Sequence, residues 1–145
     1  MALQKHRDLG SMPDGLMKTK VEMTKGMAVA RKLNAQTKQY EICLPASGDA
    51  IYGFVDARID EKIYKFSTYD VIPAGTRAVV YTLVKDNEWR TDQFTGELAV
   101  GDLCAVGTDG KLVKTADASK AVFEIVGVQA AMAGYENAMV VAKVL

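Results

Sequence analysis

Histidine, cysteine and long apolar runs are scarce in this 145-residue chain. It has one histidine, His6, two cysteines, Cys43 and Cys104, and no stretch near the ~20 apolar residues of a membrane-spanning helix. Two cysteines far apart are no disulfide framework, so we expect both to be small buried residues in a reducing compartment. With one histidine they also fall short of the usual four zinc ligands. We therefore expect no metal, no cofactor and no membrane contact.

The motifs of common catalytic sites are missing too. The sequence has no Gly-rich phosphate loop, no nucleophile elbow and no His-Glu-x-x-His. A Ser-His-Asp arrangement would require the leading segment, which holds His6, to fold back onto the rest. Asp56, Asp60 and Glu61 could pair across strands as glycosidase acids do, but basic residues lie between them, as on a solvated rim. We expect no catalytic residues and no enzyme. A carbohydrate-binding or hydrolytic β-module is the less favoured alternative.

Length and charge indicate one globular domain with an uneven charge distribution. The length suits one domain, and the 49% hydrophobic and 25% charged residues are ordinary for a folded protein. Residues 1–40 hold eight Lys or Arg and three acids, whereas residues 41–145 hold ten bases and fifteen acids. This pattern suits docking on an acidic partner or on another copy, or simply a solvated tail. Aromatic residues do not interleave with the basic ones, and the acidic body would repel phosphates, so we expect no nucleic-acid binding.

Short apolar runs separated by turn residues predict an all-β fold, a compact β-sandwich or β-barrel. Gly53, inside one such run, indicates a bulge or a close backbone approach. A single short helix is expected at 117–123, after an Asp117 cap. The strands are predicted at 27–33, 39–44, 51–55, 63–69, 77–84, 125–128 and 138–145, with further short strands near 98–103 and 111–112.

The chain divides near residue 27 into an extended basic N-terminal arm, 1–26, and a single β-rich domain, 27–145. The arm carries four of the seven methionines, with a fifth at Met27, and a turn-rich stretch, and it could lie along a partner in extended form. A frayed terminus is the alternative. Removing residues 1–24 is then expected to leave a folded body that has lost its partner. The predicted partner contacts are Lys18, Lys20, Met23 and Lys25 in the arm, with Trp89 and Arg90 as a second patch.

Residues 25–145 resemble the capsid-decoration, or cement, proteins of tailed bacteriophages. The leading segment and the stretch 56–69 depart from the commoner pattern. The phrases that carry the resemblance are Lys25-Gly26-Met27-Ala28-Val29, Gly53-Phe54-Val55, Ile72-Pro73-Ala74-Gly75, Gly101-Asp102-Leu103, Asp109-Gly110-Lys111-Leu112, Val126-Gly127-Val128 and the final valine-rich strand.

The resemblance implies a β-rich virion protein, often trimeric, that is made in the host cytoplasm. Such a protein binds the major capsid protein on the outer surface of the capsid and stabilises the shell. Many weak contacts repeated over a shell would sum through multivalency. Another phage structural component, such as a head-fibre base or a tail part, is the alternative with the same β-body.

Overall fold

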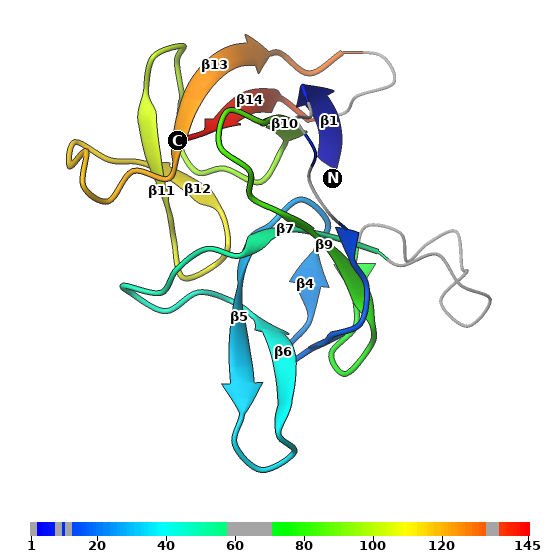
Figure 1. Cartoon of the computed structure of the whole chain (residues 1–145). Helices are drawn as coiled ribbons and strands as arrows, with labels where there is room; N and C mark the ends of the chain where they lie inside the picture. Colours follow the sequence, from blue (N-terminus) through cyan, green and yellow to red (C-terminus); the bar gives the residue numbers. More distant parts are fainter. Residues whose placement is uncertain (1–2, 8–9, 11–12, 58–70, 133–136) are drawn as a thin grey trace.

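The structure is a computed structural model that describes residues 3–7, 10, 13–57, 71–132 and 137–145. Within these residues all regular structure is β, and no helix is present. The all-β prediction is therefore confirmed. Figure 1 shows strands of two sheets with the β5–β6 hairpin at one end of the molecule and β13 at the other.

The first sheet has six antiparallel strands in the order β1-β10-β14-β13-β11-β12. It is assembled mainly from the C-terminal half of the chain, but its edge strand β1 comes from the N-terminal segment and pairs with β10. The strands are β1 (Leu3–Arg7), β10 (Glu88–Thr91), β14 (Met139–Val144), β13 (Phe123–Gln129), β11 (Leu103–Val106) and β12 (Leu112–Lys114).

The second sheet has the order β2-β9-β7-β5-β6-β3, and all its pairs are antiparallel except β3 with β6. A small third sheet pairs β4 with β8. The strands are β2 (Pro13–Asp14), β9 (Ala78–Thr82), β7 (Gly53–Ala57), β5 (Ala28–Asn34), β6 (Gln39–Cys43), β3 (Lys18–Thr19), β4 (Met23–Thr24) and β8 (Val71–Ile72).

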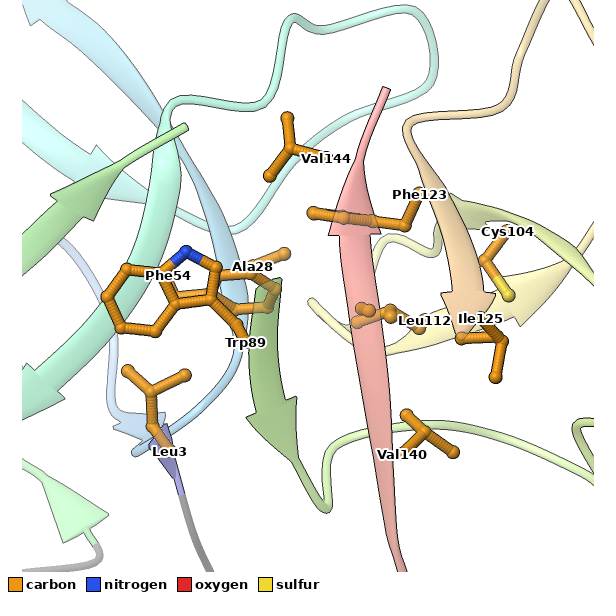
Figure 2. Close-up of a cluster of buried hydrophobic side chains, with 11 residues drawn as sticks. Leu3, Ala28, Phe54, Trp89, Cys104, Leu112, Phe123, Ile125, Val140 and Val144 are labelled. Atoms are coloured by element: carbon orange, nitrogen blue, oxygen red, sulfur yellow. The ribbon is translucent and has the colours of Figure 1, made fainter. Parts of the chain in front are cut away.

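The first hydrophobic core joins the two large sheets. Phe54 of β7 lies between Trp89 of β10 and Phe123 of β13, with ring centroids 6.0 and 5.2 Å away. Figure 2 shows these side chains together with Leu3, Ala28, Cys104, Leu112, Ile125, Val140 and Val144. Because residues from the first strand and the last strand meet here, the core closes the chain into one body.

A second core lies beneath the other face of strands β5 and β7. It contains Val29 and Val55 with methionine and isoleucine residues from the flanking short strands. Side chains alternate between the two faces of a strand, so Ala28 and Phe54 enter the first core while their neighbours Val29 and Val55 enter the second. Both faces of these two strands are therefore buried.

The described parts of the N-terminal segment are extended but bound into the sheets. Leu3, Met17 and Met23 are buried, with exposed fractions of 7%, 6% and 1%. Four short backbone-paired stretches, at 3–7, 13–14, 18–19 and 23–24, tie this segment to the body, and Lys18 also forms a bridge to Arg77. Apolar residues of the segment, Met17 and Met23 among them, fill core positions, so the described parts of the predicted arm pack against the domain.

Two other details of the sequence prediction have clear outcomes. The helix expected at 117–123 is a turn, in which Asp117 Oδ1 accepts hydrogen bonds from the backbone N–H and the hydroxyl of Ser119. Asp117 therefore caps a turn, and strand β13 begins soon after it, at Phe123. The close approach expected at Gly53 is confirmed, because a Cβ there would collide with the Tyr81 carbonyl. The strand expected at 63–69 lies outside the described residues.

Candidate interaction surfaces

Three basic residues of the predicted contact set, Lys18, Lys20 and Lys25, lie on or beside the short strands β3 and β4. Lys18 and Lys20 are exposed at the β3 edge, where Lys18 is opposite Glu41 in the register and the Lys20 N–H donates to the Ile42 carbonyl at 2.9 Å. Lys25 lies farther along, with its Nζ 3.6 Å from Asp56 Oδ1 of β7. The structure therefore groups Lys18 with Lys20 and gives Lys25 a carboxylate partner of its own.

Met23 and Trp89 are core residues and not surface contacts. Each is 1% exposed, Met23 in the second core and Trp89 in the first. In this conformation neither side chain is exposed for contact with a partner. The sequence carried a signal for Trp89: it lies between Glu88 and Arg90, and this alternation points the indole inward.

Arg90, the remaining member of the set, lies on the outer face of the first sheet. It borders a hollow of about 430 Å³ that also includes His6, Glu88 and valines of β13 and β14. His6 Nε2 is 3.5 Å from Glu88 Oε2, and Arg90 Nε is buried with no hydrogen-bond partner in the structure that we describe. Arg90 thus remains available for the partner contact predicted for it.

Metal-ligating clusters and reactive thiols are both absent from the described residues. Over the described part of the chain, no three or more His, Cys, Asp or Glu residues are placed to hold a metal ion. Burial raises the pKa of Cys43 and raises that of Cys104 to about 11. The reactive form of cysteine is the thiolate, so neither thiol is a good nucleophile at neutral pH. No helix among these residues is long and apolar enough to cross a bilayer.

Another hollow, of about 450 Å³, lies between the loop that follows β6 and the turn that precedes β13. Its lining consists mainly of small residues, and the polar ones are Ser47, Asp49, Thr108, Ser119 and Lys120. Asp49 is already bonded to Lys32 Nζ at 2.7 Å and to the Ala46 N–H at 2.7 Å. These bonds lower the pKa of Asp49, as expected for a carboxylate that stabilises the fold through its hydrogen bonds.

The sequence reasoning missed one group of exposed residues. Arg31, Leu33 and Tyr40 lie on the β5–β6 hairpin, and Leu33 and Tyr40 are 53% and 50% exposed. The available signal was that Leu33 and Tyr40 continue the apolar alternation of Val29 and Ile42 beyond the core toward the polar turn. Periodicity alone does not show where a strand leaves the body of a protein.

Comparison with known proteins identifies a solved structure with a similar fold. No family model and no curated protein matches the sequence. Among solved structures, the chain is similar to the N base of the head fiber protein gp8.5 of bacteriophage phi29. The TM-score is 0.58 at 17% identity, and the match covers 94% of this chain and 93% of that one. At this identity the likeness shows a shared fold.

Proposed function

We propose that the protein is a structural component of a bacteriophage particle and forms the base of a head fibre. The observation that carries this proposal is the fold match to a head-fibre base, because it covers nearly the whole of both chains. The phrases shared with decoration proteins point independently to the outside of a phage head. Fold alone does not define function, so the proposal needs the surface properties as well.

The surface properties agree with an adhesive role. The body consists of sheets that share buried strands, and the described residues hold no metal cluster and no exposed thiol. A fibre base must hold its shape while it contacts the shell on one side and a fibre on the other. Residues exposed at opposite ends of the molecule, on the β5–β6 hairpin and near β13, could provide two such contacts (Figure 1).

The partner and the assembly state follow from the same proposal. The major capsid protein is the proposed partner on the capsid exterior, and a trimer is the proposed assembly. Symmetric self-association would repeat each weak contact several times. A head-fibre base is favoured over a cement protein because the fold match is to a fibre base.

Particles that lack the protein distinguish the two roles. For a fibre base, deletion of its gene should give heads that lose their fibres but keep their DNA after heating. For a cement protein, the same deletion should give heads that release DNA at a lower temperature. Electron microscopy with gold-labelled antibody should place the protein at the feet of head fibres. Label confined to the tail, or no label on particles, would overturn the proposal.

A further inference from the structure

The β5–β6 hairpin has two faces of different character. On one face the polar groups are paired within the chain: Lys32 Nζ is 2.7 Å from Asp49 Oδ2, and Asn34 Nδ2 donates to Glu41 Oε1 at 3.0 Å. The register places Lys32 opposite Glu41 and Asn34 opposite Gln39. The polar groups on this face are already bonded within the chain, so the face offers little to a partner.

The other face presents a stacked arginine beside exposed apolar side chains. The Arg31 guanidinium carbon lies 4.7 Å from the centroid of the Tyr40 ring and 4.5 Å from that of Tyr52. Leu33 is directly opposite Tyr40 in the register, and both are about half exposed. Within the described residues no carboxylate lies within ion-pair distance of Arg31. We call Arg31, Leu33, Tyr40 and Tyr52 the hairpin surface.

The hairpin surface is held in place by the leading segment. The Tyr52 hydroxyl donates to Asp14 Oδ2 at 2.8 Å, and Asp14 Oδ1 accepts from the Leu16 N–H at 3.2 Å. Leu16 is 81% exposed and extends the apolar area. Because Tyr52 is fixed by this bond, the guanidinium between the two rings is ordered before any partner arrives. Pre-ordering of this kind lowers the entropy cost of binding.

We propose that the hairpin surface docks on a different protein of the phage particle, one that presents a carboxylate beside apolar side chains. The inference rests on the proposed function, since it takes the partner from the particle. Tyrosine and arginine are the types enriched at interface hot spots, and a stacked guanidinium still offers N–H groups that can bind a carboxylate at two points.

The charge of this end of the molecule favours an acidic partner. Residues 13–44, which hold the hairpin and the short strands beside it, have six bases and three acids. The bases are Lys18, Lys20, Lys25, Arg31, Lys32 and Lys38, and the acids are Asp14, Glu22 and Glu41. Two of the bases, Lys25 and Lys32, pair with Asp56 and Asp49 from outside this range, which leaves a smaller positive excess. An excess of positive charge steers association with negatively charged surfaces.

A second copy of the chain is a weaker candidate for this partner. Two carboxylates in the loops beside β11 and β13 already have cations, because Asp102 Oδ1 is 2.8 Å from Lys114 Nζ and Asp117 Oδ2 is 4.0 Å from Lys120 Nζ. Docking on either would require breaking an existing interaction. Exposed Asp86, in contrast, has no lysine partner among the described residues and is a carboxylate that a second copy could offer. A surface with unpaired carboxylates on another protein meets no such cost.

Photo-crosslinking in assembled particles tests the identity of the partner. The full chain would carry p-benzoylphenylalanine in place of Tyr40, and a control would carry it in place of Gln39 on the paired face of the same hairpin. We expect the Tyr40 position to crosslink to another virion protein, in a peptide containing Asp or Glu, at several times the yield of the control. A crosslink to a second copy of the chain, or equal yields from both positions, would overturn the inference.

A charge reversal tests the role of Arg31. The Arg31→Glu variant should be incorporated into particles at least about tenfold less than wild type, whereas Lys120→Glu, with the same change in net charge on an exposed loop, should be incorporated normally. Unchanged emission from the single tryptophan would show that both variants fold. Normal incorporation of folded Arg31→Glu would overturn the inference and leave the proposed function standing. Absence of the wild-type protein from particles would overturn both.

Discussion

The ring of Phe54 on β7 lies against the indole of Trp89 on β10, with 6.0 Å between their centroids and both side chains fully buried. These residues come from different six-stranded sheets, so the contact joins the two halves of the molecule. Phe123 continues the stack on the other side of Phe54 (Figure 2). The stability of the fold should therefore depend strongly on this one ring.

Phe54→Ala should lower the free energy of unfolding by about 3–5 kcal/mol, because it removes a buried ring and leaves a cavity between the sheets. Urea denaturation followed by the fluorescence of Trp89 measures this change. Leu16→Ala, at a position 81% exposed, is the matched control and should change the value by less than about 0.5 kcal/mol. Equal effects of the two substitutions would contradict the assignment of the core.

Gly53→Ala should destabilise the protein by about 3 kcal/mol or more, because a new Cβ would meet the Tyr81 carbonyl and lie 2.7 Å from Val80 Cγ1. The backbone of β7 and β9 would have to separate. Thermal unfolding is the measurement, and Gly15→Ala is the control, since its Cβ would find only Val79 Cγ2 at 3.8 Å. If Gly53→Ala has the same melting temperature as wild type, β7 and β9 are farther apart than in this structure.

Removal of residues 1–24 should unfold or aggregate the protein instead of leaving an intact body. The deletion takes away all of β1, β2, β3 and β4, and it removes Leu3, Met17 and Met23 from the two cores. Circular dichroism and limited proteolysis of the purified fragment would show the loss. A fragment with cooperative unfolding and wild-type protease resistance would restore the arm hypothesis.

Both cysteine thiols should react slowly with a disulfide reagent at pH 8. Cys104 is fully buried and its pKa is raised to about 11, mainly by that burial, so little thiolate forms. Cys43 is buried and its pKa is raised for the same principal reason. Absorbance of the released thiol measures the rate in native protein and in urea, where both should react quickly. Rapid reaction of two thiols in the native protein would be inconsistent with this core.

The Asp102–Lys114 interaction should contribute to stability at neutral pH and not in strong acid. The hydrogen bond from Lys114, followed by that from the Ala99 N–H, lowers the pKa of Asp102 in the folded state. A lowered folded pKa stabilises above the unfolded pKa of about 3.9, and the effect is lost as pH falls through the folded value.

Comparison of Asp102→Asn with wild type isolates this effect. The melting temperatures should differ at pH 7 and converge below about pH 3, where the wild-type carboxylate is protonated. Asp86→Asn is a control at an exposed carboxylate for which the structure gives no such interaction with a lysine. A difference in melting temperature that stays the same in acid would show that Asp102→Asn destabilises the protein for a reason other than loss of the charged carboxylate.

The sequence predicted the strand-rich fold well because apolar alternation and glycine turns are local signals. The strands near Val29, Ile42, Val80 and Val141 were found in this way. Local signals could not show that β1 pairs with β10, since Leu3 and Thr91 are brought together by tertiary structure.

The surface was harder to predict for the same reason. Trp89 was assigned to a contact because its type is common at interfaces, whereas its strand neighbours turn it inward. Arg31 was passed over because its importance depends on Tyr52, which is distant in the sequence and lies on the other side of the guanidinium from Tyr40. Contacts of this kind exist once the sheets have assembled.

Strands β5 and β7 send neighbouring residues into different cores, Ala28 and Phe54 to one and Val29 and Val55 to the other. Within the described residues, separating a layer from these two strands would therefore disturb both cores. Mechanical load applied at the hairpin end would reach both cores through the same pair of strands. In the fibre base that we propose, such shared anchoring would resist drag and collisions.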